Sequence, residues 1–350
     1  MADINCLKMF MKISILSILL AGFILISPGI AQEFDILKII DINNKDDIES
    51  VRNELNDFIF GEEGLKYNSM PDSVTSSIND EDFKGMPNLK EITRLTIETD
   101  WGLNSIVYLF IPHKANNQLV IYHQGHNGKF SHGKNTIAAL LERGYHVVGM
   151  SMPLLGMNRQ PVVDLSGFGK VCISSHNLIS YLSPVSGHPV RYFLDPVTTV
   201  VNYLQQFNFD RISMVGISGG GWTTTLYAAV DPRIQYSFPV AGTFPLYLRS
   251  QDLPSIGDYE QYVPEVYEVV NYLEMYILGS FGENRKQVQV LNEFDKCCFS
   301  GTGYRTYVDI IKGRVQKLGK GSFDVFLDSS HHEHKISDIA IGLILESLEE

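Results

Sequence analysis

The chain has 350 residues, of which 44% are hydrophobic and 19% are charged. These values exclude a disordered or fibrous protein and provide enough apolar material for one large core or two smaller ones. The formal net charge is −12 and the sequence has no dense run of lysine and arginine, which argues against a nucleic-acid partner and against binding to an anionic membrane surface.

The first 31 residues have the pattern of a secretory signal peptide. Lys8 and Lys12 precede an apolar run from Ile13 to Ile26, and a turn with small residues follows, up to Ala31. A membrane anchor is the alternative interpretation, but the run of about 14 apolar residues is shorter than the about 20 that a transmembrane helix needs. We therefore expect cleavage after Ala31 and a secreted or periplasmic protein without a stable membrane span.

Residues 32–88 are predicted to form an extension ahead of the main domain. Apolar residues recur at roughly helical spacing between Asp35 and Phe60, which indicates an amphipathic helix on the outside of the domain. The segment from Gly61 to Asn88 is rich in Ser, Asn, Asp, Gly and Pro, a composition typical of a loop.

Residues 89–350 are predicted to form an α/β domain. Two segments with strand character, 89–99 and 103–111, form a predicted hairpin. From the strand at 119–122 onward, apolar strands alternate with helices, and glycines mark the turns. This alternation is typical of a parallel sheet with helices on both faces, so we expect a three-layer α/β/α sandwich. The later predicted strands are 145–150, 211–215, 235–242, 287–291 and 323–327, and the predicted helices are 135–143, 196–206, 223–230, 304–317 and 337–347.

The segment 244–286 is longer than an ordinary connection and is rich in tyrosine. We interpret it as a partly helical insertion that forms a cap over the carboxyl ends of the strands. Its tyrosines suggest an aromatic wall for a pocket.

A candidate nucleophile lies in the motif Gly216-Ile217-Ser218-Gly219-Gly220. A Gly-x-Ser-x-Gly pattern alone also arises by chance in glycine-rich loops, but here it stands between a predicted strand and a predicted helix. A serine at such a sharp turn has a strained backbone that projects its hydroxyl above the sheet edge, and only small neighbours fit there. Ser218 is therefore the predicted nucleophile, and the N–H of Gly219 is a predicted oxyanion donor.

A serine hydroxyl needs a base and a carboxylate that orients the base. Asp295 follows the predicted strand at 287–291 and is the predicted carboxylate, with Glu293 as the alternative.

The loop after the last predicted strand contains His331, His332 and His334. We favour His334 as the base because it lies just ahead of the predicted helix cap Ser337. The other two histidines remain alternatives.

The loop after the strand at 119–122 contains glycines that allow the backbone to approach a substrate. The N–H of His126 in this loop is the predicted second oxyanion donor, and a plain turn is the alternative. His123, His126 and His132 could add ligands to a metal site near the later histidines. However, no standard zinc spacing such as His-Glu-x-x-His occurs, so we expect no metal and no cofactor.

Three cysteines, Cys172, Cys297 and Cys298, lie outside the predicted leader. In an oxidising compartment an odd number leaves one thiol free. We interpret all three first as buried small hydrophobic residues, and a disulfide from Cys172 to one of the other two stays open.

These residues resemble the α/β-hydrolase superfamily, in its secreted esterase and dienelactone-hydrolase-like branches. The resemblance rests on the motif at 216–220, on the order Ser218, Asp295, His334, and on the segment 145–158. It implies a mostly parallel eight-stranded sheet, with Ser218 as nucleophile, His334 as general base and acid, and Asp295 as its orienting carboxylate.

The expected function is that of an exported serine hydrolase that cleaves small-molecule carboxylic esters through an acyl-enzyme. One alternative is a serine peptidase or amidase on the same fold. Another is a non-catalytic ligand-binding protein of this fold, suggested by Gln124-Gly125 at the place where the family usually has His-Gly.

Overall fold

The computed structural model describes residues 35–249 and 256–350. The predicted leader at 1–31, with its cleavage site after Ala31, lies outside these residues. Residues 37–350 form one compact unit. Within the described ranges, no helix combines the length and the apolar character that crossing a membrane requires.

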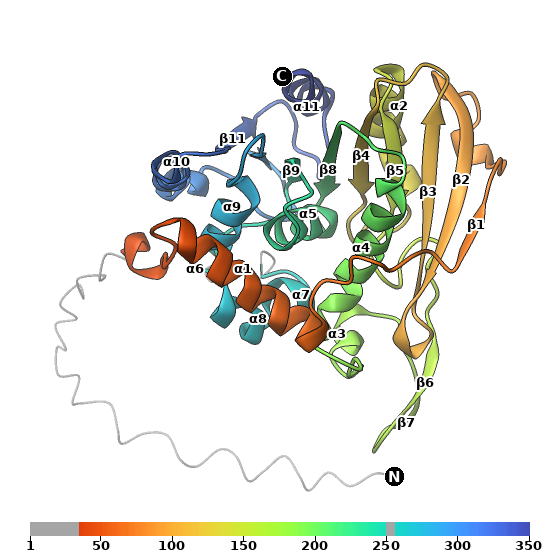
Figure 1. The fold of residues 1–350 in the computed structure, drawn as a ribbon, viewed down its shortest axis with the longest axis horizontal. Coiled ribbons are helices and arrows are strands. Elements are labelled where there is room, and N and C mark those ends of the chain that lie inside the picture. The colour runs from red at the N-terminus through yellow and green to blue at the C-terminus, as the bar shows by residue number, and fades with distance from the viewer. Residues whose placement is uncertain (1–34, 250–255) are drawn as a thin grey trace, which may run out of the picture. The chain divides into compact units, whose positions relative to one another are not determined.

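A nine-stranded sheet forms the centre of the described part, in the order β1-β2-β3-β5-β4-β8-β9-β10-β11 (Figure 1). Its strands are β1 (Ser73–Thr75), β2 (Leu89–Glu98), β3 (Asn104–Pro112), β4 (Gln118–His123), β5 (His146–Met150), β8 (Arg211–Ile217), β9 (Tyr236–Val240), β10 (Lys286–Asn292) and β11 (Ser322–Asp328). The pairs from β1 to β5 are antiparallel, and the pairs from β5 to β11 are parallel. The three-residue strand β1 is an addition at the edge of the eight strands that the resemblance implies.

Helices cover both faces of the sheet. The helices are α1 (Lys45–Phe60), α2 (Lys134–Glu142), α3 (His176–Ile179), α4 (Arg191–Gln205), α5 (Gly219–Val230), α6 (Leu246–Arg249), α7 (Tyr259–Tyr262), α8 (Pro264–Val269), α9 (Tyr272–Ser280), α10 (Val308–Leu318) and α11 (Asp338–Glu349). Helices α2 and α11 pack together on one face, whereas α5 packs against α1, α4 and α9 on the other (Figure 1).

The alternation of side chains along β4 divides the core between these two layers. Val120 and Tyr122 belong to the hydrophobic cluster that contains α2 and α11. Leu119 and Ile121 are equally buried and point to the opposite face, where α4 and α5 lie. Both faces of the central strand are therefore covered, and the predicted three-layer α/β/α architecture is confirmed.

Every residue of α5 is buried, although the helix contains three threonines. The hydroxyls of Thr223, Thr224 and Thr225 donate to the carbonyls of the residues four positions earlier, so none of these polar groups is left without a partner. Because these hydroxyls form hydrogen bonds within the helix, α5 can be buried among other helices and pack directly against β8, the strand that precedes it.

The tyrosines of the predicted insertion lie mostly in the core. Tyr272 and Tyr276 are buried, and the ring of Tyr272 stacks on Tyr267 at 4.8 Å between ring centroids. Tyr267 accepts a hydrogen bond from Trp222 Nε1. These rings fix α9 against α5, so the expectation that they form a pocket wall is wrong for Tyr272 and Tyr276. The domain boundaries of the sequence analysis, with a cap at 244–286, stay predictions.

The cysteines do not occupy the buried positions that we expected. Cys172 and Cys297 are exposed and Cys298 is partly buried, and all three thiols are free. Cys172 ends β7 (Gly169–Cys172), which pairs only with β6 (Val162–Leu165) in a separate hairpin. These thiols lie in a surface hairpin and in a surface loop, which are not part of the hydrophobic core.

Candidate active site

Ser218 stands alone between β8, which ends at Ile217, and α5, which begins at Gly219. Its backbone has φ 56° and ψ −126°, a conformation that is costly for a residue with a side chain. The surroundings hold it there: the Ser218 N–H donates to Val240 O at 2.9 Å, and the Trp222 N–H donates to Ser218 O at 2.9 Å. Ser218 therefore has the geometry of a nucleophile elbow.

The glycines around Ser218 occupy positions where no side chain fits. A Cβ added at Gly216 would lie 2.1 Å from Gly220 O, and one added at Gly220 would lie 2.1 Å from His123 O. The close approach of β8, α5 and the end of β4 thus depends on these glycines. The predicted need for small neighbours is confirmed.

The loop after β4 passes directly beside the start of α5. A Cβ at Gly125 would lie 2.6 Å from Ser218 Cβ and 3.0 Å from Gly219 N. A Cβ at Gly219 would lie 2.5 Å from His126 Cε1. The structure thus brings both predicted oxyanion residues, Gly219 and His126, to the nucleophile candidate. The first N–H groups of a helix have no partner within it and are available to an anion.

His334 and Asp295 form a close pair. Nδ1 of His334 lies 2.6 Å from Oδ2 of Asp295, whose side chain is almost fully buried. Burial alone would raise the pKa of Asp295, but hydrogen bonds from His334 and from the Cys297 N–H outweigh it and lower that pKa. The ionised carboxylate holds the proton of His334 on Nδ1 and leaves a lone pair on Nε2.

Nε2 of His334 is buried and has no hydrogen-bond partner among the described residues. The structure does not place a hydrogen bond between this nitrogen and the hydroxyl of Ser218. In ligand-free enzymes, such catalytic hydrogen bonds are often long and tighten only when substrate is bound.

The other two histidines in the loop after β11 have different partners. Nε2 of His331 lies 3.3 Å from Oδ2 of Asp328. The ring of His332 stacks on Phe294, with 5.0 Å between ring centroids. Only His334 contacts the predicted carboxylate, so the geometry favours it among the three alternatives.

Glu293, the alternative carboxylate, accepts a hydrogen bond from the Ser329 hydroxyl. The structure gives it no contact with His334. Asp295 is therefore the better placed of the two acids.

Hydrogen bonds hold the loop that carries His334 at both of its ends. Asp328, the last residue of β11, accepts hydrogen bonds from the Ser330 N–H at 2.9 Å and from the Ser337 hydroxyl. From the neighbouring strand, Asn292 Nδ2 donates to Lys335 O at 3.0 Å. These contacts position the ring of His334 over the carboxyl end of β10.

A second group of ionisable side chains lies next to the loop after β4, the predicted oxyanion loop that carries Gly125 and His126, and the sequence analysis missed this group. Nε2 of His126 lies 2.8 Å from Oε1 of Glu260 and 2.9 Å from Oδ2 of Asp258. Burial lowers the pKa of His126, but the hydrogen bonds to Asp258 and Glu260 outweigh it and raise that pKa to about 9. No motif marks Asp258 or Glu260 in the sequence, because only the fold brings residue 126 to residue 260.

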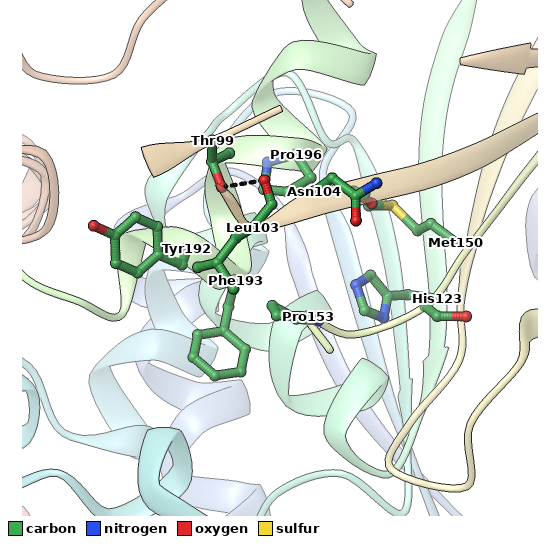
Figure 2. Close-up of a pocket in the computed structure, with 11 residues that line it drawn as sticks. Thr99, Leu103, Asn104, His123, Met150, Pro153, Tyr192, Phe193 and Pro196 are labelled. Carbon is green, nitrogen blue, oxygen red and sulfur yellow. Dashed lines mark hydrogen bonds between the residues drawn. The ribbon is translucent and has the colours of Figure 1, made fainter. Parts of the chain in front are cut away.

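A small pocket of about 10 Å³, with room for about one water molecule, lies beside the start of the same loop. Figure 2 shows the rings of Tyr192 and Phe193 on one side of it and His123 with Met150 on the other. Burial lowers the pKa of His123 to about 4, so its ring is neutral at neutral pH. Ser218 does not line this pocket, which therefore neighbours the candidate site and is separate from it.

No family model matches the chain, and no curated protein matches it in sequence. Its structure is similar to that of an acetyl xylan esterase from Paenibacillus sp. R4, with a TM-score of 0.58, 14% identity, and coverage of 89% of this chain and 96% of the other. An acetyl xylan esterase from Thermoanaerobacterium sp. JW/SL YS485 gives a TM-score of 0.54 and 14% identity, covering 89% of this chain and 97% of the other. A Pyrococcus furiosus esterase gives a TM-score of 0.51 and 11% identity, covering 79% of this chain and 98% of the other.

At these identities the likeness concerns the fold. Together with the strand order and the turn at Ser218, it establishes that the chain has the α/β-hydrolase fold. The fold predicted from the sequence is confirmed.

Proposed function

We propose that the protein is a serine hydrolase that cleaves carboxylic esters. The observation that carries the proposal is the hydrogen-bonded pair of His334 and Asp295. Nε2 of His334 is buried and has no hydrogen-bond partner among the described residues. The same fold holds Ser218 at a strained turn. A buried base without a partner is costly unless it serves a reaction. The similar solved structures support ester bonds as the substrate class, because the three compared above are named as esterases.

The reaction proceeds through an acyl-enzyme. Nε2 of His334 takes the proton of the Ser218 hydroxyl while Oγ attacks the ester carbonyl carbon, and Asp295 stabilises the resulting imidazolium. The N–H groups of Gly219 and His126 donate to the oxyanion. His334 then gives its proton to the leaving alcohol. Water, activated in the same way, releases the acid and restores Ser218.

The proposal is tested by turnover of a panel of model esters of graded acyl length. Ser218→Ala should abolish turnover on every member of the panel. Ser213→Ala is the matched control, because Ser213 is a buried serine of β8, the strand that ends just before Ser218, and lies outside the site. Undiminished ester turnover in Ser218→Ala would refute the proposal. Kinetics on an ester and its matching amide, measured side by side, would reveal a preference for amides and so favour a peptidase or amidase.

We also propose that the protein is exported, on the basis of the leader pattern at 1–31. N-terminal sequencing of the protein recovered from outside the cytoplasm should begin at Gln32. An N-terminus at Met1 on the recovered protein would contradict cleavage.

A further inference from the structure

Four side chains from three separate segments meet beside the oxyanion loop. His126 follows β4, His176 begins α3, Asp258 precedes α7, and Glu260 lies within α7. One potential ligand atom from each lies within 4.8 Å of all the others. The ester-cleaving reaction proposed above gives these side chains no role, so their convergence needs a separate explanation.

Two atoms in this cluster are buried without a hydrogen bond. Glu260 is fully buried and His176 is 5% exposed. Oε2 of Glu260 and Nδ1 of His176 lie 3.3 Å apart, yet neither has a hydrogen-bond partner in the described part of the chain. An unsatisfied carboxylate oxygen in a protein interior is expensive.

The second ring nitrogen of His176, Nε2, shows which tautomer the neutral ring has. Nε2 lies 3.0 Å from the carbonyl oxygen of Pro153, which can only accept, so Nε2 carries a hydrogen. In the neutral ring, Nδ1 then presents a lone pair to the Glu260 carboxylate, and the two repel unless a proton or a metal cation lies between them. A metal-bound histidine usually donates its other ring N–H to a backbone carbonyl or a carboxylate, as Nε2 of His176 does here.

We propose that His126, His176, Asp258 and Glu260 bind one divalent transition-metal ion, with zinc as the best fit. Imidazole nitrogens and carboxylate oxygens are both ligand types that zinc accepts, and four of them match its usual coordination number. His126 Nε2 lies 2.8 Å from Oε1 of Glu260 and 2.9 Å from Oδ2 of Asp258, and His176 Nδ1 lies 3.3 Å from Oε2 of Glu260. These distances are at or below the about 3.3 Å between ligands of a tetrahedral zinc with bonds of about 2.0 Å.

Charge and access agree with this assignment. A metal ion binds the deprotonated imidazole, so binding displaces the proton that His126 otherwise shares with Asp258 and Glu260. With both imidazoles neutral, the four side chains carry a net charge of −2, which one divalent ion neutralises. Glu260 and His176 close the inner side of the cluster, whereas the Asp258 side chain is 49% exposed and leaves a path for the ion. Ca²⁺ and Mg²⁺ prefer oxygen ligands and fit two imidazoles poorly.

Such an ion would have a structural role. It would connect the loop that carries His126, directly beside Gly219, to the segment that carries Asp258 and Glu260. The three segments that supply the ligands are widely spaced in the sequence, which explains why no zinc motif is visible there. The metal site does not depend on the proposed esterase activity, and its test requires no substrate.

The test uses the full chain without a histidine tag. Metal content is measured by mass spectrometry, and the metal-free protein is then titrated with Co²⁺, whose visible absorption reports tetrahedral coordination. We expect about one zinc per chain in the wild type, and Co²⁺ binding weakened more than about 100-fold in Glu260→Gln and in His176→Gln. His113→Gln is the matched control, because His113 is exposed at the end of β3, and it should bind as the wild type does.

The wild-type titration decides the matter even if a variant fails to fold. In the competing arrangement both imidazoles are protonated and neutralise the carboxylates themselves. Nitrogen NMR of the wild type would then show two N–H groups on His126 and on His176, unchanged by added zinc, and this result would overturn the proposal. Equal loss of Co²⁺ binding in His113→Gln would overturn it as well.

Discussion

Nδ1 of His334 lies 2.6 Å from Oδ2 of Asp295, across 39 positions of sequence. The two residues come from the loops after adjacent parallel strands, β10 and β11. Their pairing is therefore a direct consequence of strand order: neighbouring parallel strands bring their carboxyl ends, and the loops that follow them, to one edge of the sheet.

Replacing Asp295 by Asn should lower kcat by about 10³- to 10⁴-fold with little change in fold, because an amide cannot hold His334 in the required tautomer. The measurement is steady-state kinetics on a model ester. Glu293→Gln is the control and should stay within about threefold of the wild type, since Glu293 contacts Ser329 and not His334. Equal losses in the two variants would contradict the assignment of Asp295.

Two of the three loop histidines, His334 and His332, should respond differently to substitution by Gln. His334→Gln should lose at least about 10³-fold in kcat because it removes the base. His332→Gln should keep nearly full activity, since the ring of His332 only stacks on Phe294. Near-wild-type turnover in His334→Gln, with loss in His332→Gln, would reverse our choice.

Asp328 should make a pH-dependent contribution to stability. Burial raises its pKa, but the hydrogen bonds from Ser330 and Ser337 outweigh it, and the net pKa in the folded protein is below the usual 3.8. The contribution is therefore fully present above about pH 3.8 and is lost as the pH falls through the lower folded-state value.

The difference in free energy of unfolding between the wild type and Asp328→Asn should thus be constant near neutral pH and shrink below about pH 3.8. Denaturant unfolding at a series of pH values measures it. A difference that grows on acidification would show that the sign is wrong.

Two glycine-to-alanine substitutions should change the free energy of unfolding in opposite directions. Gly220→Ala places a Cβ 2.1 Å from His123 O and should destabilise the fold by about 1–3 kcal/mol while displacing the oxyanion loop. Gly313→Ala is the control: Gly313 is an exposed residue of α10, with nothing within 4 Å of the added Cβ. It should stabilise by about 0.5–1 kcal/mol. Urea denaturation compares them, and equal effects would contradict the packing at Gly220.

The sequence predicted the parallel strands and the elbow because both leave local signals. Buried strands such as 119–122 read as continuous apolar runs, and the turn at Ser218 requires glycines at fixed positions. The order of the site residues along the chain, with loops after successive strands, was equally visible.

Other features left no local signal or a misleading one. Strand β1 (Ser73–Thr75) is short and exposed, so it lacks the apolar pattern of a strand. The helix expected at 196–206 begins earlier than predicted: α4 begins at Arg191 and contains Pro196 in its interior. The helix continues through it because packing of its buried face outweighs the missing N–H.

Glu260 could not have been singled out from the sequence. It lies in a tyrosine-rich segment among exposed acidic residues, and its partners are His126 and His176. Its burial is set entirely by the placement of α7 against the oxyanion loop. Tertiary contacts of this kind carry no periodicity that a sequence pattern could detect.

The most direct test of the account is to react the protein with a fluorophosphonate and locate the covalent adduct by peptide mass spectrometry. We predict one adduct, on the peptide that contains Ser218, with no labelling in Ser218→Ala and full labelling in Ser213→Ala. An adduct on another residue, or labelling that persists in Ser218→Ala, would contradict the central claim that Ser218 is the nucleophile activated by His334.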